Sequence, residues 1–349
     1  MKVLLLHEMS GVHTELKKAL RELGVHADIA TLGDFFKKYN TDVYLGPPDP
    51  TIKGNFLRAY NQMMLIPKLR EYDIIQLISP NPFYKLIQPL LEKIVYHNKK
   101  IVYIAAGSDA IYLNYVRELE YFPPHIHFDR WSDNERLKHF EQLKSKLSKN
   151  CSHIVPLCWE YKEFMRKAGL NPENIIPFPI DITKNIPTKK SNSKIVVFHP
   201  LNRIDLNYDF KGTLKIKEVF EKLQTKYPDV EFVTKGNMSH KEYDLFTNNV
   251  DIIVDQCNSY SYGMSAAYGL AKGKVVLSSL HQRARNEEFY KDCPVITIKP
   301  EIDFIEYELE KLLQDRKSIT EISEKSRAFA EEHHDSLKVA QKYLELYKK

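Results

Sequence analysis

Two positively charged residues follow one apolar segment of the chain closely enough to bind a diphosphate together. Residues 195–199 form an apolar run that predicts a strand, and Arg203 and Lys211 come after it. Lys211 directly precedes residues 212–226, whose spacing predicts a helix. An arginine holds phosphate oxygens in bidentate fashion, and a lysine acts as a point charge. The pair predicts a diphosphate site on this strand-to-helix loop; the alternative is two surface charges on a polar loop.

A second loop of the same kind favours the diphosphate site. The apolar run at 250–255 predicts a buried strand, and a polar loop continues to Gly263. Small residues at 264–272 then predict a helix, and 275–278 a further strand. Open α/β sheets bind ligands at the carboxyl ends of their strands, where the start of a helix favours an anion. The sequence therefore predicts that both loops converge on a phosphate-bearing ligand.

The elements that must position these loops form two series of alternating strands and helices. Apolar runs in the first half predict strands at residues 2–6, 27–31, 74–78, 101–105 and 153–157. Those in the second half predict strands at residues 195–199, 230–234, 250–255, 275–278 and 295–298. Residues 182–193 are polar, contain Pro187 and predict a linker. The pattern indicates an α/β protein with two Rossmann-like domains that face a central cleft.

The composition is that of an ordinary globular chain. It has 349 residues, of which 43% are hydrophobic, and four cysteines. No segment approaches the ~18 uninterrupted apolar residues of a membrane span. We therefore expect a cytoplasmic protein with reduced, mostly buried thiols.

The positive charge is concentrated in the first part of the chain. Residues 1–190 contain 27 Lys and Arg against 21 Asp and Glu, whereas the rest contain 24 against 25. One interpretation is a face that meets an anionic membrane surface or a lipid-linked acceptor, and the other is an ordinary solvated surface. The sequence contains no basic run with interleaved aromatic residues, so it gives no indication of a nucleic-acid partner.

Over nearly its whole length, and most strongly from Ile195 to Ser278, the chain resembles the GT-B glycosyltransferases of family 4, also called group 1. The matching features are the basic pair Arg203 and Lys211, and the glycine, small-residue helix and valine strand of residues 263–276. Gly11 matches the glycine loop of the family's first domain. The resemblance implies an acceptor-binding domain at 1–182, a nucleotide-sugar-binding domain at 194–335, and a final helix, 336–349, that returns to the first domain.

The chain departs from the family at the positions of its two glutamates. Tyr260 and Tyr268 stand there, and Ala106 stands where a histidine is frequent. A phenol accepts one hydrogen bond but cannot act as a bidentate anion. Asp255 and Gln256 are alternative sources of polar contacts. The expected donor-binding residues are Gly11, His199, Asn202, Arg203, Lys211, Gln256, Tyr260, Tyr262, Gly263, Met264 and Tyr268.

The resemblance implies transfer of a sugar from a nucleoside diphosphate, such as a UDP- or GDP-sugar, to a saccharide or lipid-linked acceptor. Arg203, Lys211 and the amides at 263–264 would stabilise the leaving diphosphate without a metal or other cofactor. In a retaining reaction that diphosphate takes the acceptor's proton. An inverting reaction needs a base, for which Asp109 and His13 are candidates on the acceptor side. The alternatives are a helix N-cap for Asp109 and a helix-start residue for His13.

Other function classes stay open at this point. Loss of both glutamates suits a catalytically silent nucleotide-sugar-binding homologue or partner subunit as well as an enzyme. A sugar-nucleotide epimerase with the same two-domain fold is a third possibility. A dinucleotide enzyme is disfavoured, because no GxGxxG motif follows a strand.

Overall fold

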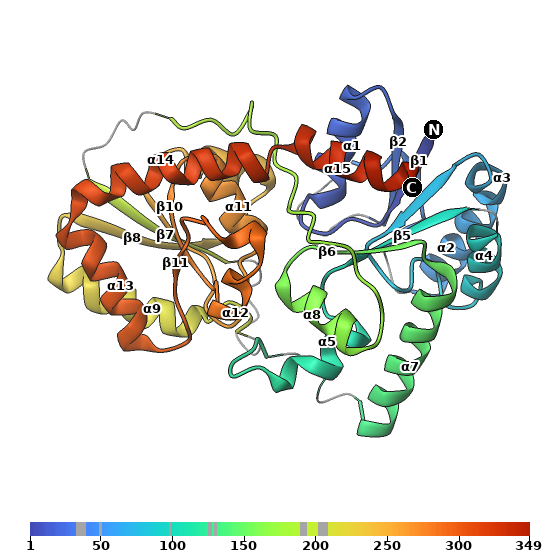
Figure 1. The fold of residues 1–349 in the computed structure, drawn as a ribbon, viewed down its shortest axis with the longest axis horizontal. Helices are drawn as coiled ribbons and strands as arrows, with labels where there is room; N and C mark the ends of the chain where they lie inside the picture. The colour runs from blue at the N-terminus through green and yellow to red at the C-terminus, as the bar shows by residue number, and fades with distance from the viewer. Residues whose placement is uncertain are drawn as a thin grey trace.

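The computed structural model describes residues 1–32, 40–48, 51–97, 99–124, 128, 131–188, 194–201 and 209–349. Within them the chain forms two lobes side by side (Figure 1). The N-terminal lobe comprises residues 1–180 and the last helix, and the C-terminal lobe comprises residues 194–334. Both lobes contain a parallel sheet with helices on its two faces, so the predicted α/β class is confirmed.

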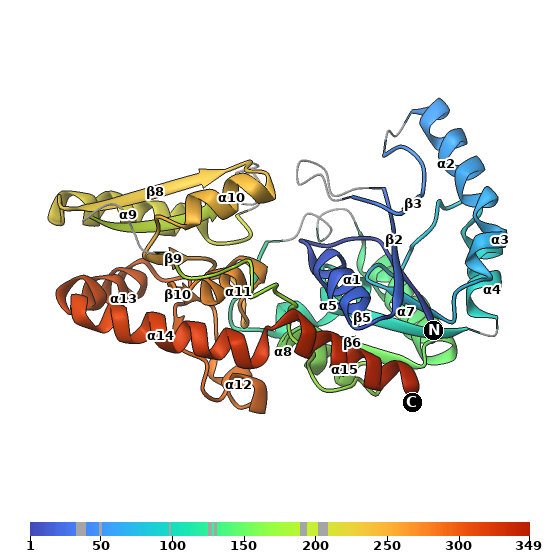
Figure 2. The same cartoon turned by 90° about the horizontal axis from the view of Figure 1, so that it is seen from above.

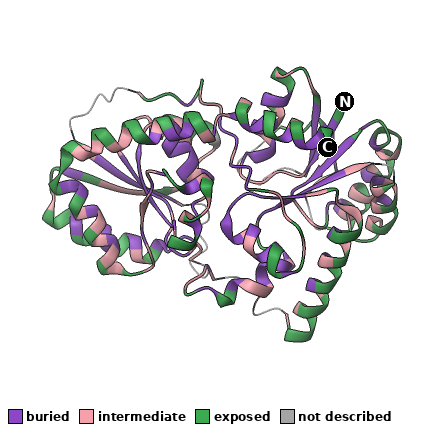
Figure 3. Ribbon diagram, viewed as in Figure 1, coloured by how far each residue is buried: buried purple, intermediate pink, exposed green. Residues whose placement is uncertain are grey.

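The sheet of the N-terminal lobe has six strands in the order β3-β2-β1-β4-β5-β6. They are β1 (Lys2–Leu6), β2 (His26–Thr31), β3 (Val43–Tyr44), β4 (Ile74–Leu77), β5 (Lys100–Ala105) and β6 (His153–Pro156). The helices are α1 (Val12–Glu22), α2 (Ile52–Met64), α3 (Ile66–Leu69), α4 (Gln88–Tyr96), α5 (Ala110–Tyr115), η2 (Val116–Glu118), α7 (Asp133–Asn150) and α8 (Trp159–Lys167). Val3 to Leu6 of β1 are fully buried, since helices cover both faces of the sheet (Figure 3).

The sheet of the C-terminal lobe has five strands in the order β11-β10-β9-β7-β8. They are β7 (Ile195–Leu201), β8 (Val230–Gly236), β9 (Ile252–Val254), β10 (Val275–Ser278) and β11 (Ile296–Thr297). The helices are α9 (Thr213–Lys226), α10 (His240–Thr247), α11 (Met264–Ala271), α12 (Gln282–Arg285), η3 (Glu288–Tyr290), α13 (Ile302–Gln314) and α14 (Arg316–His333). The last helix, α15 (Ser336–Lys348), belongs to the N-terminal lobe. The strand order changes direction between β7 and β9, which places the carboxyl ends of these two strands at the switch point of this sheet.

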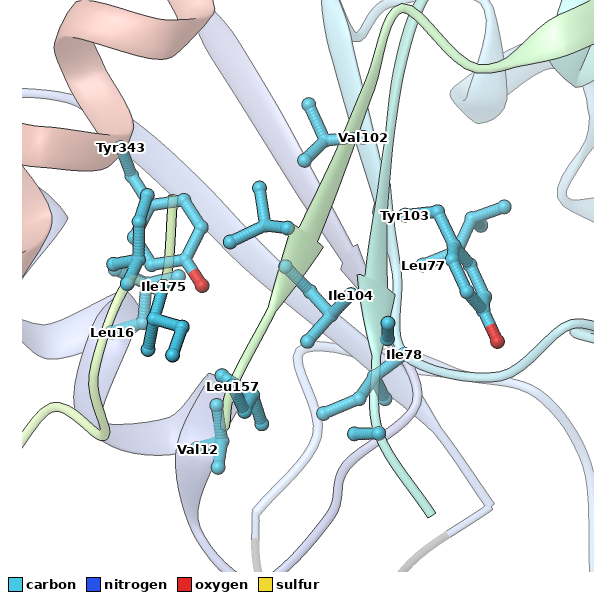
Figure 4. Packing of buried hydrophobic residues seen from close by; sticks show 14 of the residues in the cluster. Val12, Leu16, Leu77, Ile78, Val102, Tyr103, Ile104, Leu157, Ile175 and Tyr343 are labelled. Atoms are coloured by element: carbon cyan, nitrogen blue, oxygen red, sulfur yellow. The ribbon is translucent and has the colours of Figure 1, made fainter. Parts of the chain in front are cut away.

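The last helix, α15, leaves the C-terminal lobe and packs on α1, as Figures 1 and 2 show. Tyr343 of α15 lies near Leu16 of α1 in the core (Figure 4). The hydroxyl of Tyr347 donates to Oε1 of Gln76 at 2.6 Å. The predicted return of the C-terminal helix to the first domain is therefore confirmed.

The chain passes between the two lobes twice, and the two connecting segments lie side by side near Ile180 and His334. The amide of Ile180 donates to the carbonyl of His334 at 2.7 Å, and the amide of Ser336 donates to the carbonyl of Ile180 at 2.9 Å. His334 itself is fully buried. Its Nδ1 donates to the carbonyl of Phe178 and its Nε2 accepts from the hydroxyl of Tyr262, while burial lowers its pKa to about 4. The neutral imidazole of His334 thus links the connecting segment at Phe178 to Tyr262 of the C-terminal lobe.

One difference from the sequence prediction lies near the edge of the N-terminal lobe. The apolar spacing of residues 56–71 predicts a single helix, but α2 ends at Met64 and α3 begins at Ile66. Pro67 stands in the first turn of α3 and has no amide hydrogen to continue the ladder of α2.

Among the described residues, no helix is long and apolar enough to cross a bilayer.

Substitutions of Gly212 and Gly24 test whether the start of α9 is too closely packed to accept a side chain. Both have a left-handed backbone, with φ of +78° and +79°. A Cβ on Gly212 would lie 2.1 Å from Sγ of the buried Cys257, whereas one on Gly24 would meet nothing within 4 Å. We expect Gly24→Ala to lower the free energy of unfolding by about 1 kcal/mol through backbone strain alone. Gly212→Ala should cost at least about 2 kcal/mol more, through overpacking.

Urea unfolding of both variants measures the difference. If Gly212→Ala and Gly24→Ala lower the free energy of unfolding equally, the packing between the start of α9 and Cys257 can relax to accept a methyl group.

Candidate active site

A cavity of about 290 Å³ lies between the two lobes. The N-terminal lobe contributes residues after β1, β5 and β6, among them Ser10, Gly107 and Glu160. The C-terminal lobe contributes the ends of β7 and β9 and the start of α11. The carboxyl edges of both sheets therefore face one shared space, as expected for a ligand site of open α/β sheets.

Lys211 lies in the wall of this cavity but does not present an uncompensated charge. Its Nζ donates to Oδ1 of Asp255 at 2.5 Å and lies 3.4 Å from Oγ of Ser265. The two charged side chains are 7% and 1% exposed, respectively. Asp255 follows β9 and Ser265 is the second residue of α11, so Lys211 ties together both loops at the switch point. A phosphate bound here would compete with Asp255 for the ammonium group.

The start of α11 forms the second positive element of the wall. Gly263 is the N-cap and supplies no capping side chain. Gly263, Met264 and Ser265 all line the cavity. The first amides of a helix carry a partial positive charge and bind anions without needing a charged side chain. Gln256 also lines the cavity, with its amide Nε2 bonded to the carbonyl of Ser261 at 2.8 Å.

The glycine loop after β1 has an unusual backbone. His7 and Ser10 have positive φ angles of 68° and 56°, and Gly11 has φ 94° as the N-cap of α1. Two oxygens of Glu8 accept from the amides of Gly11 and Thr14, which fixes the loop, and burial raises the pKa of Glu8. Ser10 lines the cavity, whereas Gly11 shapes the loop that carries it. Strained loops of this kind concentrate at functional sites.

His199 and His13 lie in the two cores, away from the cavity lining. Nδ1 of His199 donates to the carbonyl of Val254 and its Nε2 accepts from Thr213, whereas Nδ1 of His13 donates to the carbonyl of His7. Both are fully buried, and burial lowers the pKa of each to about 4. His199 was expected to contact the donor and His13 the acceptor. These positions do not fit those roles, because both imidazoles are hydrogen-bonded to neighbouring segments inside the lobes.

Asp109 is the N-cap of α5. Its Oδ1 accepts from the amide of Tyr112 at 2.8 Å and its Oδ2 from the hydroxyl of Tyr103 at 2.7 Å. It is 6% exposed, and burial raises the pKa of its carboxyl group. Asp109 is not among the residues that line the cavity, although its neighbour Gly107 is. The geometry therefore favours the capping alternative over a catalytic base or acceptor contact.

The tyrosines of the 260–268 segment divide into two groups. Tyr262 and Tyr268 line the cavity. Tyr260 does not: its ring stacks on His281 with centroids 3.9 Å apart and on Trp159 at 5.6 Å. Its hydroxyl accepts from the amide of Glu120 in the other lobe at 3.1 Å. Tyr260 thus belongs to the contact between the lobes, and the expected donor contact does not fit its position.

Asn202 and Arg203 lie outside the part of the chain that the structure describes. The convergence of Arg203 with Lys211 on a diphosphate stays a prediction. Among the described residues, no group of three or more His, Cys, Asp or Glu side chains is placed to hold a metal ion.

Glu160 lines the cavity from the start of α8 and was not predicted from the sequence. Its Oε1 accepts hydrogen bonds from the hydroxyl of Ser259 and from the amides of Tyr260 and Ser261, each at 2.8 Å. The signal was present, because Glu160 follows the strand predicted at 153–157 at the kind of strand-to-helix junction used elsewhere. What the sequence could not indicate was its contact with the other lobe.

Comparison with solved structures defines the class of fold. HepE from Anabaena, crystallised with UDP-glucose, is 12% identical, with a TM-score of 0.67 and coverage of 100% of both chains. Sucrose-phosphate synthase from Thermosynechococcus elongatus is 12% identical, with a TM-score of 0.70, over 100% of this chain and 98% of that one. The lipopolysaccharide outer core galactosyltransferase WaaB is 13% identical, with a TM-score of 0.54, over 98% of both.

These neighbours are GT-B glycosyltransferases, and this chain has their fold of two Rossmann-like domains around a cleft. Comparison with models of protein families finds none that matches. Comparison of the sequence with characterised proteins finds no match either.

The energetic coupling between Lys211 and Asp255 can be tested, because both side chains are buried. Lys211→Ala should lower the free energy of unfolding by about 3–5 kcal/mol, because it leaves a buried carboxylate unpaired. Lys211→Ala/Asp255→Ala should lose much less than the sum of its single variants, which a double-mutant cycle in urea measures. Lys222→Ala is the control: its side chain is 45% exposed beside Glu218, and its loss should cost less than about 1 kcal/mol. Additive losses for Lys211 and Asp255 would contradict the pairing.

Proposed function

We propose that this protein is a glycosyltransferase that moves a sugar from a nucleoside-diphosphate donor to a saccharide or lipid-linked acceptor. The observation that carries the proposal is the cavity between the two Rossmann-like lobes, with Lys211 and the start of α11 in one wall. The UDP-glucose bound to HepE and the galactosyltransferase activity named for WaaB support the same class of substrate.

The proposed chemistry breaks the bond between the anomeric carbon and the leaving diphosphate oxygen. The acceptor hydroxyl forms the new bond to that carbon, and its proton goes to the diphosphate on the same face, so that configuration is retained. Lys211 and the first amides of α11 stabilise the charge that grows on the diphosphate. We propose that this positive wall replaces a metal ion. The positions of Asp109 and His13 away from the cavity lining favour retention over a mechanism in which either residue acts as the base.

A second candidate is a nucleotide-sugar-binding homologue without turnover. The pairing of Lys211 with Asp255 favours it, because a compensated ammonium group stabilises a leaving phosphate less than a free one does. A sugar-nucleotide epimerase would instead convert the donor without any acceptor.

Release of nucleoside diphosphate from a panel of UDP-, GDP- and ADP-sugars, with and without added saccharides, tests the enzyme. We expect release from one donor, unaffected by EDTA, and a product whose anomeric configuration, read by proton NMR coupling, matches that of the donor. Lys211→Ala should lower kcat/KM about 100-fold, the scale of one lost transition-state donor. Lys217→Ala on the exposed side of α9 should change it little.

Binding of a nucleotide sugar without release would select the silent homologue. Conversion of a donor in the absence of acceptor would select the epimerase.

We further propose that helix α2 docks the N-terminal lobe on an anionic membrane surface. Its exposed apolar residues recur at helical spacing along one stripe: Ile52 is 91% exposed, Phe56 71%, Tyr60 54% and Met64 62%. The segment 51–70 contains four Lys and Arg residues and no Asp or Glu. An apolar stripe flanked by positive charge is the surface that binds an interface rich in acidic lipids. Figure 2 shows α2 at the edge of the N-terminal lobe, away from the C-terminal lobe.

Sedimentation with phospholipid vesicles tests this surface. The protein should bind vesicles that contain phosphatidylglycerol and should dissociate as salt screens the charges. Phe56→Glu/Tyr60→Glu should abolish binding, whereas Leu214→Glu/Leu245→Glu, at exposed leucines of the C-terminal lobe, should leave it intact. Equal binding by both double variants would contradict the proposal, and self-association through α2 would assign the stripe to a second copy.

A further inference from the structure

One side chain in the cavity wall is anchored in a way that fixes the direction of its oxygen. Gln256 lies just after β9, lines the cavity and is half-buried. Its side-chain Nε2 donates to the carbonyl of Ser261 at 2.8 Å. Its backbone carbonyl accepts from the amide of Ser279 at 2.7 Å and from Oγ of the same residue at 3.1 Å. Both the main chain and the side chain of Gln256 are therefore held within the C-terminal lobe.

These bonds also decide which atom of the Gln256 side chain can serve a ligand. The carbonyl of Ser261 needs a donor, so the nitrogen of the amide group faces it and Oε1 takes the other position. Within the described part of the chain, Oε1 accepts no hydrogen bond. The buried oxygens without a partner in that part of the chain do not include Oε1, so this atom keeps accessible surface. Gln256 thus offers a hydrogen-bond acceptor to the occupant of the cavity.

The space beside this oxygen is kept open by a glycine that the backbone does not require. Gly263, the N-cap of α11, has φ −109° and ψ −171°, an extended conformation open to other residues. A Cβ there would lie 3.7 Å from Oε1 of Gln256 and 3.8 Å from Oδ2 of Asp255, which are ordinary contact distances. Among the described residues, neither strain nor a clash therefore excludes a methyl group. Because Gly263 lines the cavity, that methyl group would occupy ligand space instead.

The position of this space at the start of α11 indicates which part of the proposed donor it receives. The first amides of α11 attract the phosphates. The β-phosphate is bonded to the anomeric carbon of the sugar, and of the two ring atoms next to that carbon only C2 carries a hydroxyl. A phosphate oxygen is anionic and donates no hydrogen bond, so it does not suit Oε1 of Gln256, whereas a hydroxyl does.

We propose that Oε1 of Gln256 accepts a hydrogen bond from the C2 hydroxyl of the transferred sugar, and that the anomeric end of this sugar lies against Gly263. This deepens the proposed function and rests on it. Gln256 then determines specificity at C2, because a sugar without a hydrogen-bond donor there leaves Oε1 without a partner in a site that excludes water. Gly263 determines that the sugar can approach this oxygen at all.

Gln256→Met tests the contact, because methionine keeps the length of the side chain and removes the acceptor. Calorimetric affinities are measured for UDP and UDP-glucose, or for GDP and GDP-mannose if the protein prefers guanosine. We expect about 10- to 100-fold weaker binding of the nucleotide sugar and a change of less than about threefold for the diphosphate alone. Gln224→Met is the control: Nε2 of Gln224 also donates to a backbone carbonyl, that of Val230 at 3.0 Å, but lies outside the cavity lining and should change neither affinity.

A second measurement uses the unaltered protein, in case Gln256→Met does not fold. Fluorine cannot donate a hydrogen bond, so the nucleotide sugar with fluorine in place of the C2 hydroxyl should bind about 10- to 100-fold more weakly than the natural one. In Gln256→Met the same replacement should cost less than about threefold, since the two losses report one contact. Fluorine at C6 should have equal effects in both proteins.

Gly263→Ala tests the space without altering Gln256. The added methyl group should weaken binding of the nucleotide sugar at least about 10-fold more than binding of the diphosphate, because it lies where the sugar is expected. Equal affinities of Gly263→Ala and the unaltered protein for the nucleotide sugar would place the sugar elsewhere and overturn the inference.

The remaining outcomes separate this inference from the proposed function. Equal losses for the diphosphate and the nucleotide sugar in Gln256→Met would assign its side chain to the phosphates. Full affinity of the unaltered protein for the C2-fluorinated analogue would show that the C2 hydroxyl is not bound. Either result overturns the inference and leaves the proposed function standing. If the unaltered protein binds neither nucleotide pair, the proposed function fails, and the inference fails with it.

Discussion

The cavity exists because a loop of one lobe is tied to the start of a helix in the other. Oε1 of Glu160 gathers three donors of the 259–261 loop, and the ring of Tyr260 stacks between Trp159 and His281 beside it. A continuous apolar cluster runs from the core of the N-terminal lobe through this loop into α11. Parallel sheets expose ligand-binding loops only at their carboxyl edges, so the contact decides that the two edges face each other.

Charge is then distributed unevenly around the space between the lobes. The wall from the C-terminal lobe carries Lys211, paired with Asp255, and the positive end of α11, whereas the N-terminal lobe contributes the side chain of Glu160. Burial makes each of these groups dependent on its partners: Lys211 on Asp255, and Glu160 on three donors. A ligand with an anionic end and a hydroxyl-rich end matches this polarity, and a nucleotide sugar has both.

The sequence predicted the architecture well because apolar runs at strand length and helical spacing are local signals. They indicated both sheets, the loops after β7 and β9, and the small-residue helix α11. Six of the expected donor-binding residues line the cavity, namely Lys211, Gln256, Tyr262, Gly263, Met264 and Tyr268, and their contact with a donor stays a prediction. Roles that depend on long-range contacts were harder to predict. The buried imidazole of His199 and the stacking of Tyr260 depend on neighbours distant in sequence. The N-cap of Asp109 is local, and it was one of the two roles that the sequence offered for that residue.

A crystal structure with the preferred nucleoside diphosphate bound would test the central claim most directly. We predict that the phosphate oxygens lie within about 3.2 Å of Nζ of Lys211 or of the first amides of α11, and that Asp255 loses its hydrogen bond to Lys211. A diphosphate bound outside the cavity between the lobes, or one bound within it but remote from both groups, would contradict the account.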